Sequence, residues 1–264
     1  MIDFLIELSL IPGLVIFIIA IISFSLIIYL TFHYLIKDNL KKSHNNVGRI
    51  LFRVAASLLS LILSITFANQ RVSYFQLKTS MVAEASKMVD IIIDLDLLDT
   101  EEGNLIKAKI RNYVLYISED GWKSLQEDPF HSRPFALFRE IYIDINHLEA
   151  NTPLQERLKG SMLNDIDVIS DYLQVRLYSS REKSNPLIYT SLFGLAGIMI
   201  LFSVFPPDRL TIGFLCIYTA FIGIILYFIL MMGNPLKGPL QIEASPFLLL
   251  KETIEANIQL EIQK

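Results

Sequence analysis

The feature of this sequence that most constrains its fold is a run of uncharged, mostly apolar residues from Ile11 to Ile36. A helix needs about 20 apolar residues to cross a hydrocarbon core about 30 Å thick, and this run is long enough. It is too long for the apolar core of a signal peptide, and Asp3 and Glu7 stand where a signal peptide carries basic residues. We therefore expect residues 11–36 to form a transmembrane helix.

A second uncharged run covers residues 54–70 and is bracketed by Arg53 and Arg71. Along a helix these two arginines are roughly 27 Å apart, which is close to the apolar thickness of a bilayer. Each guanidinium can therefore reach a headgroup layer or water while the residues between them cross the membrane. Residues 54–70 are predicted to form a second transmembrane helix.

Two further apolar runs predict transmembrane helices at residues 186–205 and 210–232. They are separated by Pro206-Pro207-Asp208-Arg209, in which the two prolines cannot continue a helix and indicate a tight turn. The sequence therefore predicts an all-α, multi-pass membrane protein. Its four transmembrane helices form two hairpin pairs, with a long extramembrane insertion between the pairs.

The insertion, residues 71–185, is predicted to be a helical domain because its apolar residues recur at helical spacing and do not alternate as in strands. Asp99-Thr100-Glu101-Glu102 resembles a capping box at the start of one helix. Further helices are expected near residues 135–149 and 153–181. No helix breaker follows the second span, so that span is predicted to continue into the insertion as one long helix. The apolar positions are Leu77, Met81, Met88, Ile92, Leu95, Leu105, Ile106, Ile110, Tyr113, Val114 and Ile117.

The chain is predicted to end in an amphipathic helix over residues 245–262. Ser245 is expected as its N-cap, because a serine side chain can accept a hydrogen bond from the first turn. Pro246 is expected at the first helical position, where its missing N–H costs nothing.

Composition excludes several classes of function. Hydrophobic residues make up 53% of the chain and charged residues only 19%, whereas about 25% of a soluble domain is charged. The net charge of −4 argues against nucleic acid as a partner. The single cysteine, Cys216, can form neither an internal disulfide nor a thiolate metal cluster. An acidic cluster within residues 90–102 lacks the glycine and the closing glutamate of an EF-hand, which favours a solvated turn.

No catalytic motif is found in the sequence. Nothing resembles a phosphate-binding loop or a nucleophile elbow, so we expect no enzyme activity, no cofactor and no metal. Zinc-ligand spacing is absent from the four histidines, which are His33, His44, His131 and His147.

The second predicted span carries a polar stripe, since its basic and hydroxyl residues share one helical face. One interpretation is that the stripe lines a pore, with hydroxyls binding a passing ion and arginines at each mouth favouring anions. The alternative is that small residues allow close helix packing, with each hydroxyl bonded back to the preceding turn. Both interpretations place this face toward the inside of an assembly. The candidate pore-lining residues are Arg53, Ser57, Ser60, Ser64, Arg71 and Lys78.

Small residues at spacings of three and four also mark the last two predicted spans. Gly194 and Gly197 in the third span, and Gly213 and Gly223 in the fourth, are typical of helix-packing seams. Seams on several spans offer more packing surface than one subunit can use, so a homo-oligomer is predicted, most simply a closed ring.

Several short motifs occur in a characteristic order relative to the four spans. His44-Asn45 follows the first span, Glu84-Ala85 follows the second, Tyr113 lies further along, and Pro235 and Gly238 follow the last span. In this order they resemble a bacterial membrane family usually called the bestrophin-like domain of unknown function. The resemblance extends over roughly residues 10–255.

The resemblance implies a function as well as a fold. Bestrophins are pentameric anion channels with four spans per subunit, a second span that lines the pore and a helical cytosolic region. By this analogy the chain is expected to be an oligomeric, anion-leaning ion channel, with inorganic ions and the lipid bilayer as partners and a bacterial inner membrane as its location. The alternative is a non-conducting scaffold or accessory subunit whose helical domain docks a partner protein.

The side of the membrane that holds the helical domain is predicted differently by the charge of the first loop and by the family resemblance. The loop before the second span is rich in basic residues, so the positive-inside rule places that loop in the cytoplasm and the helical domain outside. The resemblance to bestrophins implies the reverse, and we favour a cytoplasmic helical domain. The basic residues of the loop are Lys37, Lys41, Lys42, Arg49 and Arg53.

Overall fold

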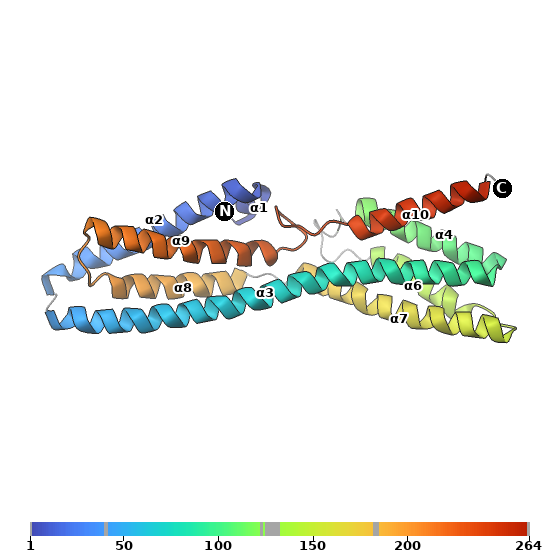
Figure 1. Cartoon of the computed structure of the whole chain (residues 1–264), viewed down its shortest axis with the longest axis horizontal. Helices are drawn as coiled ribbons and strands as arrows, with labels where there is room; N and C mark the ends of the chain where they lie inside the picture. Colours follow the sequence, from blue (N-terminus) through green and yellow to red (C-terminus); the bar gives the residue numbers. More distant parts are fainter. Residues whose placement is uncertain (1, 40–41, 122–123, 125–132, 182–184, 263–264) are drawn as a thin grey trace. The chain divides into compact units, whose positions relative to one another are not determined.

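The computed structural model describes residues 2–39, 42–121, 124, 133–181 and 185–262 (Figure 1). These residues are almost entirely helical and contain no strand, which confirms the predicted all-α class. The chain divides into two compact units. Unit 1 comprises Met1–Tyr74 and Lys183–Gln241, and unit 2 comprises Phe75–Glu182 and Ile242–Lys264.

Unit 1 contains the apolar helices. It begins with α1 (Ile2–Glu7), α2 (Leu10–Ile36) and the 3-10 turn η1 (Lys37–Asn39), and α3 (Lys42–Leu98) follows. The helices α8 (Asn185–Phe202) and α9 (Arg209–Met232) complete the unit, and α2 packs against both (Figure 1).

Three helices of the described chain, α2, α3 and α9, are long and apolar enough to cross a membrane. The predicted third span, residues 186–205, corresponds to α8, whose apolar stretch Pro186–Phe202 is shorter than the other three. The helix ends at Phe202 because the chain turns before the two prolines. The fourth membrane crossing therefore stays a prediction.

The expectation of one long helix is confirmed, since α3 is continuous over 57 residues. Within unit 1 it packs through a narrow seam of small and apolar residues. Phe52 lies against Phe202, with ring centroids 4.9 Å apart. A Cβ on Gly194 would lie 3.3 Å from Leu59 Cδ1, so this glycine permits the close approach of α8 to α3.

Unit 2 is a bundle of amphipathic helices. It contains the end of α3, α4 (Glu101–Tyr116), the π-helical turn η2 (Ile117–Gly121), α6 (Arg133–His147), α7 (Pro153–Arg181) and α10 (Ser245–Ile262). The predicted helix at residues 153–181 has the bounds of α7, and the one near 135–149 corresponds to α6. Each helix of the bundle contributes buried apolar side chains to the core, for example Met88, Ile110, Ile141, Met162 and Phe247.

Two helix starts differ from their predicted caps. Thr100 caps α4 by accepting a hydrogen bond from Gly103 N at 3.1 Å, and because Gly103 occupies the third helical position there is no reciprocal glutamate of a capping box. Asp99 is not a cap and instead has a positive φ of 46° at the end of α3. In α10, Ser245 is already helical, and Ala244 O accepts from Phe247 N and Leu248 N.

The connection after α9 explains one of the family-motif residues. Gly238 has a φ of 87°, a conformation that L side chains rarely adopt. A Cβ there would lie 3.0 Å from Ile6 Cγ2 and 3.1 Å from Ile6 O. Gly238 therefore lets this connection turn against α1.

We expect Gly238→Ala to destabilise the protein by roughly 1–3 kcal/mol, because the substitution adds both backbone strain and a steric clash. The measurement is the thermal unfolding midpoint of the purified protein in detergent. Gly160→Ala in α7 is the matched control, since a Cβ at Gly160 meets no other atom within 4 Å. Unchanged stability of Gly238→Ala would contradict this account of the turn.

Candidate functional site

The arginine–serine stripe lies on a face of α3 that the chain itself leaves exposed. Arg53, Ser57, Ser60 and Ser64 are all exposed, and they lie to one side of the seam formed by Leu59 and Leu63. The apolar face on the other side of the seam is exposed as well, for example at Leu58, which is 55% accessible. Packing among the residues that the structure describes thus leaves these four stripe residues and the opposite face exposed.

The hydroxyl groups of the stripe are partly satisfied by the helix itself. Ser57 Oγ donates to Arg53 O at 2.7 Å, and Ser64 Oγ donates to Ser60 O at 2.8 Å. Such bonds to the preceding turn direct a hydroxyl's lone pairs outward. This is the geometry expected under the packing interpretation, and a rotation of the hydroxyl would be needed before it could donate to an anion.

The remaining stripe residues continue along the exposed side of α3. Arg71 is exposed near the end of unit 1, and Lys78 is exposed in unit 2. The pore-lining role of all six residues stays a prediction, since contacts within one chain do not test it.

A cavity of 820 Å³ borders the first half of the stripe inside unit 1. It lies between α3, the end of α8 and the start of α9, close to the turn that joins α8 and α9. Its wall combines two arginines and four hydroxyl groups with seven apolar residues. The lining residues are Arg49, Phe52, Arg53, Ala56, Ser57, Ser60, Met199, Phe202, Phe205, Thr211, Phe214, Leu215 and Tyr218.

The predicted packing glycines fall into two groups. Gly194 approaches α3 as described, and a Cβ on Gly223 would lie 3.5 Å from Ile18 Cα of α2. A Cβ on Gly197 or Gly213 would meet no atom of the described residues within 4 Å. Contacts within the chain therefore explain the first two glycines but not the last two.

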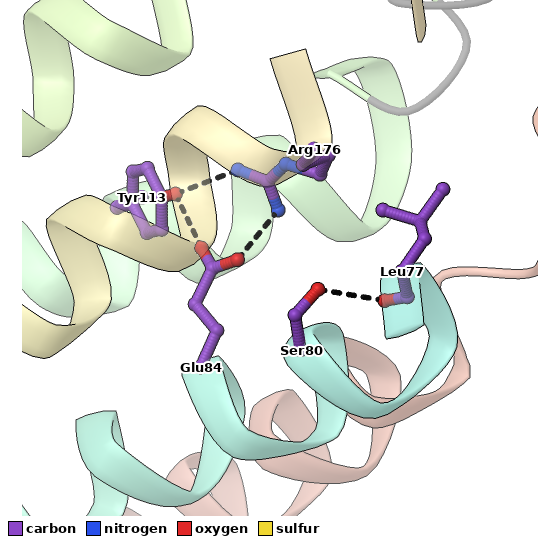
Figure 2. A network of polar contacts seen from close by, with 5 residues as sticks. All are labelled: Leu77, Ser80, Glu84, Tyr113 and Arg176. Carbon is purple, nitrogen blue, oxygen red and sulfur yellow. Dashed lines mark hydrogen bonds and ion pairs between the residues drawn. The ribbon is translucent and has the colours of Figure 1, made fainter. Parts of the chain in front are cut away.

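Two of the family-motif residues meet in a buried polar network in unit 2. Glu84 comes from α3 and Tyr113 from α4, and Arg176 from α7 completes the network (Figure 2). Their exposed fractions are 0%, 0% and 1%. Three helices therefore converge on one charged cluster inside a mostly apolar core.

Each member of the network contacts the other two. Tyr113 Oη donates to Glu84 Oε1 at 2.8 Å and accepts from Arg176 Nη2 at 3.0 Å. Arg176 Nη1 lies 3.1 Å from Glu84 Oε2 as an ion pair. The guanidinium also lies over the ring of Phe247 from α10, 5.4 Å from the ring centroid. Arg176 Nε has no hydrogen-bond partner within the described part of the chain.

Burial controls the protonation of this cluster. It raises the pKa of the Glu84 carboxyl, while the Arg176 charge and the Tyr113 hydrogen bond act in the opposite direction. Burial and the neighbouring Glu84 also raise the pKa of the Tyr113 hydroxyl. Tyr113 therefore keeps the proton that it donates to Glu84, and Arg176 compensates the buried carboxylate.

The other predicted residues lie apart from this network. Pro235 is buried in the connection after α9, and Gly238 forms its turn. The side chains of His44 and Asn45 lie outside the described residues. The acidic cluster of residues 90–102 contributes to ion pairs, such as Lys107 Nζ to Asp96 Oδ1 at 2.6 Å.

Arg176 is not among the candidate site residues that the sequence predicts. Tyr113 and Arg176 are 63 residues apart, and no local motif connects them. The available signal was a basic residue within the apolar period of a predicted helix, where a lone charge would be costly.

We expect Arg176→Met to destabilise the protein by about 3–5 kcal/mol at neutral pH, because it leaves a buried carboxylate uncompensated. The folded-state pKa of Glu84 then rises further above its unfolded value. The stabilising contribution of the neutral acid is present below the unfolded pKa and is lost as the pH rises through the folded pKa. The loss in stability should therefore be smaller at about pH 5 than at about pH 8.

Thermal unfolding of the full chain in detergent at both pH values provides the measurement. Tyr113→Phe is the matched control. It removes a hydrogen bond that lowers the pKa of Glu84 but removes no charge, so its effect should depend on pH in the same direction but less strongly. Adding Glu84→Gln to Arg176→Met should recover part of the stability. A deficit of Arg176→Met that is independent of pH would contradict a compensated buried carboxylate.

Comparison with known proteins gives one family. The sequence model of one family, the bestrophin-like domain, matches residues 19–247, which is most of the chain. No curated protein and no solved structure matches the chain. The matched region includes the stripe on α3 and all three members of the buried network, and the chain belongs to the bestrophin-like domain family.

Proposed function

We propose that this protein assembles as a homo-oligomeric ion channel with a preference for anions, in which α3 between Arg53 and Arg71 lines the path. Five copies is the number that the similarity to bestrophins implies. A bacterial inner membrane is its proposed location, and inorganic ions are the proposed substrates. Membership of the family supports a relationship to ion channels, and the details rest on α3.

The proposal rests on one observation, which is that α3 packs within the chain through one face and leaves its arginine–serine face exposed. A narrow seam around Leu59 and Leu63 serves packing within the chain, whereas the arginine–serine face stays exposed. The arginines at both ends of this face reach headgroups or water, and the serine hydroxyls between them gain hydrogen bonds from water or protein but not from lipid tails. The face is therefore better placed against water or a neighbouring subunit than against lipid.

Charge along α3 supports the preference for anions. From Lys42 to Ala83 the helix has no acidic residue. A low-dielectric wall with charges of one sign raises the local concentration of the opposite ion. The basic residues in this stretch, histidine aside, are Lys42, Arg49, Arg53, Arg71 and Lys78.

Symmetric assembly supplies the geometry of the path. One exposed helical face cannot enclose a pore, but copies related by a rotation axis place identical faces around that axis. Gly197 and Gly213, which no contact within the chain explains, are proposed to pack between subunits.

The proposal is tested by flux of anions through liposomes that contain the purified protein. Conduction supports a channel. A defined oligomer that conducts neither anions nor cations would favour the non-conducting scaffold or accessory subunit.

Arg71→Glu is expected to reduce anion selectivity, and to do so more at low salt than at high salt, because an exposed charge acts through a screened field. The measurement is the reversal potential under a salt gradient at two ionic strengths. Arg139→Glu, an exposed arginine of α6, makes the same change of charge outside the proposed path. Equal selectivity of the two variants would remove Arg71 from the path.

Ser60→Leu is expected to lower conductance several-fold while the oligomer stays intact, because a larger apolar side chain narrows and dewets the path. Conductance and oligomer size are measured on the same preparation. Ser60→Thr is the control, since it retains the hydroxyl and adds only a methyl group. If Ser60→Leu instead disrupts the oligomer, the serine face packs between helices and does not line a pore.

A further inference from the structure

We propose that the cavity in unit 1 binds an anionic phospholipid from the surrounding leaflet, with the phosphate at Arg49 and Arg53 and an acyl chain against the aromatic wall. This site shares Arg53, Ser57 and Ser60 with the proposed ion path, but its occupant is an amphiphile and not a permeating ion. The volume of 820 Å³ lies in the range of ordinary ligand pockets, about 300–1,000 Å³.

The polar end of the cavity has the chemistry of a phosphate site. Arg49 and Arg53 are one helical turn apart on α3, so both guanidinium groups can reach one ligand. Neither arginine makes an ion pair with any residue that the structure describes. Asp208, at the adjacent turn, is already occupied as the N-cap of α9, where it accepts from Thr211 N at 2.7 Å. Guanidinium groups bind phosphate oxygens strongly because they donate several parallel hydrogen bonds.

The apolar end of the cavity is built from packed aromatic rings. Phe52 lies 4.9 Å from Phe202 and 6.1 Å from Tyr218, measured between ring centroids. Phe202 in turn lies 5.1 Å from Phe205. These mutual contacts hold the wall in place before any ligand arrives, and an apolar wall of this size suits a hydrocarbon chain better than a hydrated ion.

One polar atom in this wall has no partner. Tyr218 Oη is shielded from solvent and makes no hydrogen bond within the described chain. A buried hydroxyl without a partner is costly. A lipid ester or phosphate oxygen in the cavity would supply the missing acceptor.

Position along the span agrees with a lipid. The uncharged run of α3 begins directly after Arg53, and Phe205 and Thr211 flank the turn between α8 and α9. The arginines therefore lie near headgroup depth, while Phe214 and Tyr218 in the cavity wall lie further along α9, toward the hydrocarbon core. The headgroup of a lipid in this leaflet would therefore lie at the depth of the arginines, and its acyl chain at the depth of the apolar wall.

The test uses the purified full-length protein and two soluble lipids with the same chains, dioctanoyl phosphatidylglycerol and dioctanoyl phosphatidylcholine. Phosphatidylglycerol should raise the thermal unfolding midpoint in a saturable manner, and phosphatidylcholine should do so much less. Equal effects of the two lipids would overturn the proposal, and so would equal protection by inorganic phosphate, which would indicate a site for a small anion.

Variants separate the two ends of the site. Arg49→Gln and Arg53→Gln should each weaken the apparent affinity for phosphatidylglycerol about tenfold, as expected for loss of a charged contact. Arg209→Gln, an exposed arginine at the same turn but outside the cavity, should bind as the wild type does. Ala56→Phe should abolish binding by filling the cavity while both arginines remain. Unchanged affinity in all three cavity variants would overturn the assignment.

A second copy of the chain is the competing occupant. Phe214→Cys, in a Cys216→Ser background, places a single reactive thiol in the cavity wall of the intact oligomer. A disulfide between subunits would show that protein covers the cavity and would overturn the proposal, whereas a thiol that phosphatidylglycerol protects from a membrane-permeant reagent would support it. Binding is measured without flux, so a protein that conducts but does not bind lipid refutes this inference alone, and the converse result refutes the channel alone.

Discussion

Water is absent from the hydrocarbon core of a bilayer, so each peptide group there must find its hydrogen-bond partner within the protein. Helices meet this requirement along their length, but every helix leaves carbonyl groups unpaired at its end. In the turn that follows α8, two side chains of α2 supply donors to backbone carbonyls. His33 Nδ1 donates to Ser203 O at 2.8 Å, and Tyr29 Oη donates to Phe205 O at 3.2 Å. The carbonyl can only accept, so the proton must lie on Nδ1 of His33.

The sequence predicts the long helices of this fold better than it predicts their ends. Apolar runs and helical periodicity predict α2 and α7 almost to the residue, because both signals are repeated over many turns. The start of α4 is harder to predict, since adjacent polar residues can each act as a cap. Asp99 is expected to cap and Thr100 does so, and only the backbone conformation, with a positive φ at Asp99, distinguishes them.

The candidate site could be predicted only in part for a different reason. Glu84 and Tyr113 are identified through the order of family motifs, but their chemistry depends on Arg176, which packing alone brings beside them. The stripe is identified by the helical spacing of its polar residues, which places them on one face of α3. This spacing does not show what the face contacts. In the structure α3 packs through the seam at Leu59 and Leu63, which lies between the stripe and the apolar face.

The two polar features of this protein differ in how their charges are balanced. In unit 2 the charges of Glu84 and Arg176 compensate each other within hydrogen-bonding distance, so the pair attracts no external ion and serves to fix three helices. In unit 1 the described residues provide no acid for Arg49 and Arg53, and their field stays available to an external anion. What distinguishes a permeating ion from a lipid is then the neighbouring surface. The exposed serines that follow Arg53 favour a hydrated ion, whereas the aromatic rings of the cavity wall favour an acyl chain, so the same basic edge of α3 can serve both.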